Sequence, residues 1–260
     1  MTPVIIAEGL QKQFGSAEAV RDVHLSVQPG RCFGFVGPNG AGKTTTIRLL
    51  TGLIQPTAGR VTIFGKTYED TGPEIKSRIG LVQGDLMLYE YLTGEEQMLF
   101  SGRIYGLPSE AVASRVNELF DLLDLNHCRT RLVRTYSHGE RKNLSWACAL
   151  IHDPDVLFLD EPFEGIDVIS LRKIEDNLKR MIEGGKTVFL TSHILSWVDR
   201  FCDDVAIINK GSIVFSGSRN ELREAIKGDK DQANPVSDIE RAFTELIQSE
   251  KSDVSLSWLA

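Results

Sequence analysis

The sequence has no long hydrophobic run and no secretion signal at its start. No stretch of its 260 residues approaches the roughly 18 consecutive apolar residues that a membrane-spanning helix needs. Residues 1–8 lack the basic and apolar regions of a signal peptide. We therefore expect a cytoplasmic protein. If it serves a membrane, another chain must cross that membrane.

Closely spaced cysteines and an excess of positive charge are also missing. The four cysteines, Cys32, Cys128, Cys148 and Cys202, are scattered, whereas zinc sites and disulfide frameworks usually show close pairs. We expect four reduced thiols, most of them buried. The formal net charge is −7, with both signs interspersed, so there is no long-range attraction to nucleic acid and no nucleic-acid partner is expected.

The residues that are present predict an α/β protein. The chain is 42% hydrophobic and 25% charged, which is ordinary for a soluble globular protein. Short, nearly continuous apolar runs are typical of strands covered on both faces of a largely parallel sheet. These runs are Val4–Ala7, Cys32–Val36, Val156–Leu159, Val188–Leu190 and Val205–Ile208. Helical spacing falls between them, at Thr44–Gly52, Ile169–Ile182 and His193–Arg200.

The middle of the chain differs, because residues 86–151 show helical spacing and no convincing strand. Helices are expected at Thr93–Tyr105, Ser109–Leu123 and Glu140–Ile151. We therefore predict a discontinuous core of residues 1–85 and 152–220, interrupted by an all-helical subdomain of residues 86–151. A C-terminal appendage of residues 221–260 follows, with a polar linker and one further helical pattern at Asp238–Gln248.

Residues 37–44 read Gly-Pro-Asn-Gly-Ala-Gly-Lys-Thr, which satisfies the pattern of a phosphate-binding loop. They follow an apolar run and open a helix, so backbone N–H groups and the helix N-terminus would point at phosphates. Lys43 would reach the β and γ phosphates of a nucleotide, and the Thr44 hydroxyl would ligate Mg²⁺. The expected binding set is Gly37, Asn39, Gly40, Ala41, Gly42, Lys43, Thr44 and Thr45.

Two adjacent acids end the apolar run that starts at Val156. Asp160 would hold Mg²⁺ through water, and Glu161 would orient or deprotonate the attacking water. Taken alone, such a pair is equally well explained as a helix cap. Downstream of a phosphate-binding loop, it indicates a nucleoside triphosphatase.

Together these motifs resemble the ATP-binding cassette family over about residues 5–217. Phe14 stands where that family stacks an aromatic ring on adenine, although a lone Phe also fits a core position. Residues 136–140, Tyr-Ser-His-Gly-Glu, resemble the family's signature motif, which without the resemblance would be a polar turn with Ser137 as N-cap. Asp167 resembles the loop acid that touches the opposite subunit, and His193 resembles the switch histidine that contacts the γ-phosphate.

The resemblance implies a P-loop NTPase core with a helical insertion, and an ATPase that works as a dimer. Two ATP molecules would lie between two subunits, each held by one phosphate loop and by Ser137 and Gly139 of the other subunit. The expected partners are a second copy or a related cassette, and integral membrane permease subunits beneath which the protein sits on the inner face of the membrane. The end of the chain resembles cassettes that serve exporters. A soluble cassette ATPase without a membrane partner and a regulatory module that holds ATP without turnover remain as alternatives.

Two departures from the family pattern and one unusually apolar segment bear on these roles. His138 replaces the usual first glycine of the signature and would either crowd the phosphate or add a donor. Gln83 lies one position before the place of the family's glutamine, where Gly84 stands; we expect Gln83 still to reach Mg²⁺ and the attacking water, with loss of that contact as the alternative. Residues 86–92, Leu-Met-Leu-Tyr-Glu-Tyr-Leu, fit either a seam between subdomains or a groove that receives a helix from a membrane subunit.

Overall fold

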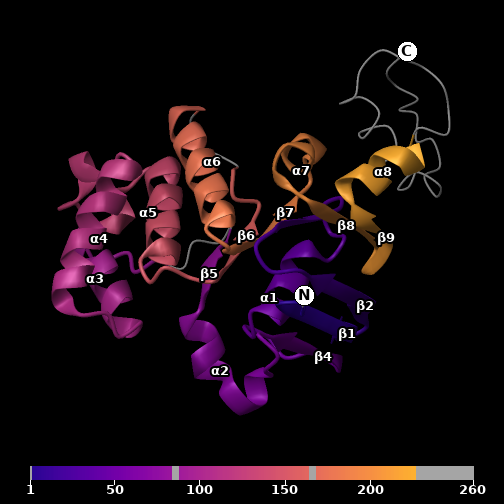
Figure 1. Cartoon of the computed structure of the whole chain (residues 1–260). Helices are drawn as coiled ribbons and strands as arrows, with labels where there is room; N and C mark the ends of the chain where they lie inside the picture. Colours follow the sequence, from indigo (N-terminus) through magenta and orange to yellow (C-terminus); the bar gives the residue numbers. More distant parts are fainter. Residues whose placement is uncertain (1, 84–87, 164–167, 227–260) are drawn as a thin grey trace, which may run out of the picture.

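The computed structural model describes residues 2–83, 88–163 and 168–226, which form two β-sheets with helices packed against them (Figure 1). The larger sheet has the strand order β5-β6-β7-β3-β8-β9, and only β9 runs antiparallel to its neighbour. Its strands are β3 (Cys32–Val36), β5 (Ile79–Val82), β6 (Val156–Asp160), β7 (Thr187–Ser192), β8 (Asp204–Asn209) and β9 (Ser212–Ser218). The parallel sheet expected from the apolar runs is thus confirmed.

The central strands β3, β6 and β7 are buried at every position and mostly apolar, because successive side chains point to opposite, equally covered faces. In β3, Cys32 and Val36 belong to one apolar cluster, whereas Phe33 and Phe35 belong to another. The first cluster includes side chains of the helices drawn in magenta and orange, and the second includes side chains of α1 and of the smaller sheet. Each large apolar side chain buried in this way stabilises the fold by about 1.5–3 kcal/mol.

The smaller sheet is antiparallel and was not expected. It has the order β2-β1-β4, with β1 at Ile5–Phe14, β2 at Ala17–Val27 and β4 at Ala58–Ile63. The apolar run Val4–Ala7 was grouped with the parallel strands, and that assignment is wrong: its residues from Ile5 onward open β1. One face of β1 packs on the core while polar residues such as Glu8 stay on the surface.

Helices and the loops between elements make up the rest of the described chain. They are α1 (Lys43–Leu50), α2 (Tyr68–Ser77), α3 (Gly94–Ile104), α4 (Ser109–Leu122), α5 (His138–Leu150), α6 (Val168–Glu183), α7 (Leu195–Phe201) and α8 (Arg219–Ile226), with 3₁₀ turns at Asn126–Cys128 and Val133–Thr135. Every helix expected before residue 226 is present within two residues at each end. Within residues 88–150 the only strand-like pairing is an isolated bridge between Thr93 and Leu132. The domain boundaries themselves remain a prediction.

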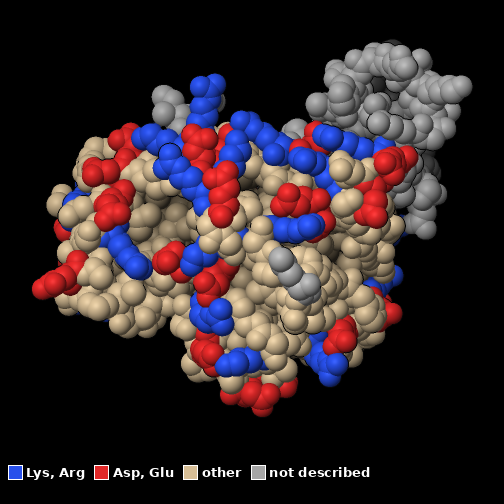
Figure 2. Space-filling model, viewed as in Figure 1, with Lys and Arg blue, Asp and Glu red and all other residues tan. Residues whose placement is uncertain are grey.

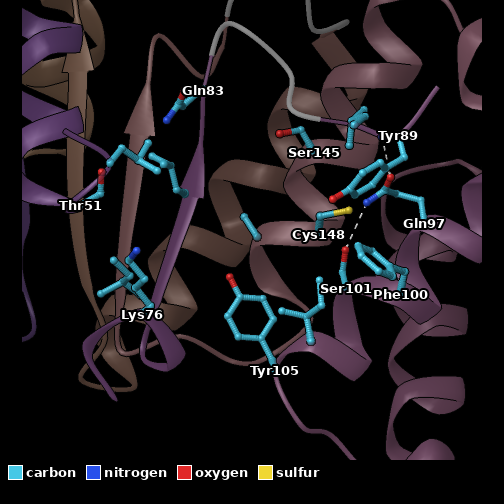
Figure 3. Close-up of a pocket in the computed structure, with 16 residues that line it drawn as sticks. Thr51, Lys76, Gln83, Tyr89, Gln97, Phe100, Ser101, Tyr105, Ser145 and Cys148 are labelled. Atoms are coloured by element: carbon cyan, nitrogen blue, oxygen red, sulfur yellow. Dashed lines mark hydrogen bonds between the residues drawn. The ribbon is translucent and has the colours of Figure 1, made fainter. Parts of the chain in front are cut away.

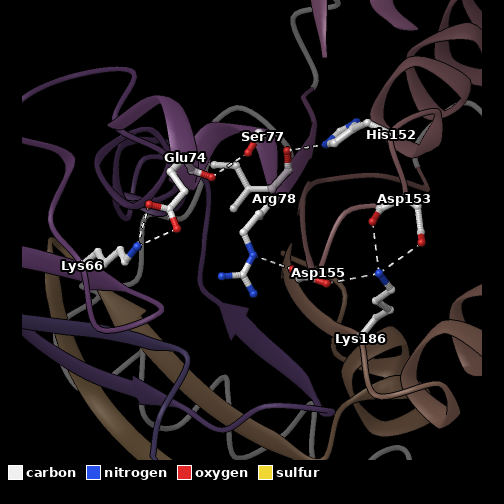
Figure 4. A network of polar contacts seen from close by, with 9 residues as sticks. Lys66, Glu74, Ser77, Arg78, His152, Asp153, Asp155 and Lys186 are labelled. Carbon is white, nitrogen blue, oxygen red and sulfur yellow. Dashed lines mark hydrogen bonds and ion pairs between the residues drawn. The ribbon is translucent and has the colours of Figure 1, made fainter. Parts of the chain in front are cut away.

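A chain of ionic contacts ties together the segments that precede β5, β6 and β7 (Figure 4). The Arg78 side chain contacts an Asp155 carboxylate oxygen at 2.7 Å, and Lys186 contacts the other at 3.2 Å. Burial alone would raise the pKa of Asp155, but the hydrogen bonds and charges of Arg78 and Lys186 outweigh it and lower that pKa below its usual value. The network therefore fastens the edge of the sheet at which the parallel strands begin.

Charges of both signs are interspersed over the face drawn in Figure 2, in keeping with the expected absence of a single-sign field. Among the residues described, no helix combines the length and apolar character needed to span a membrane.

Candidate nucleotide site

The phosphate loop joins the end of β3 to the start of α1, as expected, and close packing sets its shape. A Cβ atom on Gly37 would lie 2.3 Å from the Ile208 carbonyl oxygen, and one on Gly42 would lie 2.5 Å from that of Ala19. Gly42 also has a φ of 109°, which side chains rarely tolerate. Both glycines are thus needed for the loop to close over the N-terminus of α1.

Lys43 lies inside this loop with only 6% of its side chain exposed. Its Nζ donates hydrogen bonds to the carbonyl oxygens of Gly37 at 2.8 Å and Pro38 at 3.2 Å. It also lies 3.3 Å from Oε1 of Glu161. The ammonium group is therefore held inside the phosphate loop, where a phosphate would need a positive charge.

Asp160 and Glu161 sit at the end of β6, next to the end of β7. Thr191 donates a 2.6 Å hydrogen bond from Oγ1 to Asp160, which is 4% exposed. The second Glu161 oxygen, Oε2, lies 3.0 Å from Nδ1 of His193. The structure thus joins Lys43, Glu161 and His193, which are far apart in sequence, in one cluster.

Thr191 was not among the expected site residues. Its role follows from the register of β6 and β7, which pairs it with Asp160. Because register is a tertiary property, the sequence offers no signal for it beyond the position of Thr191 two residues before His193.

Gln83 follows β5 at the same edge of the sheet. Val82 pairs with Leu159, so Gln83 comes level with Asp160. The Gln83 side chain is buried, and its Nε2 atom has no hydrogen-bond partner among the described residues. A buried amide without a partner at this position is available for an oxygen of a ligand or a water. That Gln83 reaches the metal and the attacking water remains a prediction.

The oxygen donors at this edge match the preference of Mg²⁺. The exposed Thr44 hydroxyl lies in the first turn of α1, and the Asp160 carboxylate and the Gln83 amide lie at neighbouring strand ends. Hydroxyl, carboxylate and amide oxygens are hard ligands suited to this cation. The residues present therefore fit a Mg²⁺ ion bound together with nucleotide phosphates.

The signature residues lie at the N-terminus of α5 and do not join the cluster around Glu161. Ser137 caps the helix: its Oγ accepts from the Glu140 N–H, and its own N–H donates to Glu140. Burial acts to raise the pKa of Glu140, but the hydrogen bonds from Ser137 and His127 outweigh it and lower that pKa. The side chains of Ser137 and His138 are exposed, so this helix end is open to a second molecule.

The remaining expected residues are placed as follows. Phe14 ends β1 with 52% of its surface exposed, and Lys12 Nζ lies 5.1 Å from its ring centroid. The alternative of a buried core position for Phe14 is therefore wrong. Asp167 lies outside the described residues, as does Gly84.

The comparisons with known proteins agree with this geometry. A family model described as ABC transporter matches residues 20–164. The chain belongs to the ABC transporter family. The cassette is 37% identical over 222 residues to the Nod factor export ATP-binding protein I of Ralstonia nicotianae, covering 85% of this chain and 69% of that protein. It is 34% identical over 243 residues to the linearmycin resistance ATP-binding protein LnrL of Bacillus subtilis, covering 94% of this chain and 78% of the relative.

Solved structures support the fold of the cassette. An ATP-binding subunit of an ABC transporter superposes with a TM-score of 0.84 at 24% identity, over 93% of this chain and 99% of the other. A dimeric ATP-binding cassette in a post-hydrolysis state with ADP and Pi gives a TM-score of 0.75 at 24% identity, over 82% and 98% of the two chains. The P-loop NTPase fold is confirmed, and as a family member the cassette is an ATP-binding ATPase.

A groove of about 350 Å³ lies beside the nucleotide site of the cassette (Figure 3). Thr51, Lys76 and Gln83 line one wall, and residues of the helical region line the other. Large apolar side chains in its lining are exposed, namely Leu53, Tyr89, Phe100 and Ile104. In the segment 86–92, Leu88 and Tyr89 line the groove, whereas 86 and 87 lie outside the described residues.

Proposed function

We propose that this cassette is the ATP-hydrolysing subunit of an exporter and that it drives separate membrane permease subunits as a dimer. The observation that carries the proposal is the convergence of Lys43 and His193 on the two carboxylate oxygens of Glu161. A buried lysine from a phosphate loop, a carboxylate and an imidazole in contact are groups that can stabilise phosphate charge and activate a water for phosphoryl transfer.

ATP would bind with its phosphates against the loop amides and the N-terminus of α1. Lys43 would turn from the Glu161 carboxylate to the β and γ phosphates, while Phe14 would stack on the adenine. Thr44, Asp160 and Gln83 would hold Mg²⁺, which neutralises charge on the phosphates when it is bound.

Hydrolysis would use Glu161 as the base. Once Lys43 pairs with phosphate, the Glu161 carboxylate takes the proton of a water that attacks the γ-phosphorus, and ADP leaves. His193 would hold the γ-phosphate, and Thr191 would keep the Asp160 carboxylate fixed at its strand end. Glu161 would therefore act on the attacking water, His193 on the γ-phosphate, and Thr191 on the carboxylate of Asp160.

The exposed N-terminus of α5 supports a dimer. Ser137 and the amides of His138 and Gly139 would face the γ-phosphate of ATP held by a second copy or a related cassette, with Asp167 at the same interface. The exposed imidazole of His138 would add a donor to this surface. ATP would then hold the two subunits together until hydrolysis separates them.

The groove supports a membrane partner. Monomeric soluble proteins rarely expose several large apolar side chains together, and such patches mark interaction sites. We assign the groove to a short helix of a permease subunit, which would place the cassette on the inner face of the membrane. The names of the relatives, Nod factor export and linearmycin resistance, favour export over import.

The decisive variant is Glu161→Gln, which keeps the shape of the side chain but removes the base. We expect hydrolysis to fall by about 10²-fold or more, the range typical of a lost general base. Binding of ATP should persist, and size-exclusion chromatography should show a longer-lived ATP-dependent dimer. Glu74→Gln is the control, because Glu74 forms a surface pair with Lys66. Unchanged steady-state turnover in Glu161→Gln would contradict the role of Glu161.

The membrane partner is tested by affinity purification of the chain from its native membranes. Co-purification of an integral membrane chain would support the exporter subunit. Recovery from the soluble fraction alone, with no membrane chain, would favour the soluble cassette ATPase instead.

A further inference from the structure

Glu161 has an unusual backbone, and both of its backbone polar groups are held. Its φ is 46°, in the left-handed region that residues other than glycine seldom adopt. Its N–H donates to the Thr191 carbonyl oxygen at 3.2 Å. Its own carbonyl oxygen accepts a 3.0 Å hydrogen bond from Nζ of Lys142. The turn that aims the Glu161 side chain is thus fixed from two sides, by β7 and by α5.

Lys142 is suited to hold this turn. Its side chain is 2% exposed and lies on α5, the helix that begins after Ser137. A buried ammonium group is costly unless it is bonded, so the contact with the Glu161 carbonyl is a strong and directional one. No local pattern singles out Lys142, because its target is a backbone atom 19 residues away.

We propose that Lys142 is a positioning residue for ATP hydrolysis. By holding the Glu161 carbonyl, it keeps the left-handed turn in place and so aims the Glu161 carboxylate at the site of the attacking water. This inference rests on the function proposed above for Glu161. Lys142 itself touches neither ATP nor water in this role.

In the proposed dimer, the hydrogen bond from Lys142 to Glu161 couples the two nucleotide sites. The N-terminus of α5 would face the ATP of the partner subunit, whereas Lys142 on that helix contacts the Glu161 that acts on this chain's own ATP. A shift of α5 on engaging the partner's nucleotide would therefore reach Glu161 through a single side chain.

Lys142→Met removes the donor and keeps the length of the side chain. Because small misplacements of a reacting group cost up to about 10²-fold, we expect kcat per folded protein to fall by about ten- to a hundred-fold. The KM for ATP and the affinity for a non-hydrolysable ATP analogue should change by less than about twofold, since Lys142 does not contact the nucleotide. Lys142→Arg, which keeps a charged donor, should recover part of the lost kcat.

Lys186→Met is the matched control. Lys186 also donates to a backbone carbonyl, that of Asp153 at 3.1 Å, but it lies at the opposite edge of the sheet (Figure 4). It should lower thermal stability without lowering kcat. If Lys142→Met does not fold, Lys142→Gln, which is too short to reach the carbonyl, takes its place with the same expected kcat.

Two outcomes overturn the inference. One is a Lys142→Met protein that is less stable but has wild-type kcat and KM, which would make the bond merely structural. The other is an equal loss of kcat in Lys142→Met and Lys142→Arg, which would mean that a charged donor at this position does not restore the turn. The proposed function itself is contradicted if the wild-type chain does not hydrolyse ATP, or if Glu161→Gln hydrolyses ATP as fast as the wild type. A failure confined to Lys142 leaves that function standing.

Discussion

His152 is a buried histidine in the segment between α5 and β6. Its ring stacks on Tyr105 with centroids 3.6 Å apart and an interplanar angle of 5°, and its Nε2 donates to the Ile79 carbonyl oxygen at 2.9 Å. Burial lowers the pKa of His152 below its ordinary value, although the bond to Ile79 acts in the opposite direction. At a pH between the folded-state pKa and the unfolded-state pKa, His152 is therefore neutral in the folded protein and protonated in the unfolded chain.

This difference predicts a pH-dependent stability. The unfolded-state pKa is about 6.5, so as the pH falls from about 7 the unfolded chain takes up a proton that folded His152 does not. The free energy of unfolding should decrease over that range, down to the lower folded-state pKa. His152→Gln should be less stable at pH 7.5, because it loses the ring stack, but should show a shallower decrease in urea unfolding between pH 7.5 and 5.5. Equal slopes for the two proteins would contradict this account, since the other four histidines are unchanged.

The candidate site could be predicted from the sequence only where a residue acts through its own side chain in a known motif. Lys43, Asp160, Glu161 and His193 were expected, and the structure gathers them at one edge of the larger sheet. Thr191 and Lys142 were not, because one acts through strand register and the other through a backbone carbonyl. Neither relation leaves a local pattern in the sequence.

At the scale of elements, α3 and α5 begin with the same capping box. Thr93 and Glu96 exchange hydrogen bonds at the start of α3, as Ser137 and Glu140 do at the start of α5. In both, a hydroxyl and a carboxylate satisfy backbone N–H groups that the helix leaves free. The two caps are therefore chemically alike, but only the Ser137 cap is proposed to bind a nucleotide.

We predict that Thr93→Ala and Ser137→Ala each lower the free energy of unfolding by about 1 kcal/mol, the typical loss of a capping hydroxyl. Only Ser137→Ala should also reduce ATP hydrolysis and ATP-dependent dimerisation, because its hydroxyl is proposed to bind the partner's nucleotide. Denaturant unfolding and steady-state ATPase assays on both variants give the comparison. Equal activity in the two would mean that Ser137 is only a helix cap.

The central parallel strands β3, β6, β7 and β8 were predictable, whereas β5 and the strands of the antiparallel sheet were not. Each central strand buries both faces, so its apolar run is continuous and easily recognised. In β1 and β2 the alternation is interrupted by register shifts, and Gly9 and Asp22 near them have positive φ. Such bulges change which face a residue occupies, which hides a period of two in the sequence.

At the scale of the whole molecule, the groove lies next to the candidate nucleotide site. One wall contains Gln83, which is level with Asp160 at the edge of the sheet, and the other contains residues of α3 and α5. In that wall, Gln97 accepts from the Tyr89 N–H and donates to Ser101 (Figure 3). Burial raises the pKa of Cys148 in the same wall to about 11, so its thiol stays neutral. An occupant of the groove would therefore meet a mostly neutral surface and the side chain of Gln83, which we predict to reach the nucleotide site.

This arrangement predicts that a charge in the groove separates transport from hydrolysis. Ile104 lines the groove with 64% of its surface exposed, so Ile104→Glu should leave folding and the ATPase of the purified subunit nearly unchanged. It should weaken binding to the proposed permease subunits by about 2 kcal/mol or more, the size of an interface hot spot, or about 30-fold. Val214→Glu, on β9 and 44% exposed, is the control that should bind as the wild type does. Co-purification with membrane subunits measures both variants, and equal recovery would place the docking surface elsewhere on the molecule.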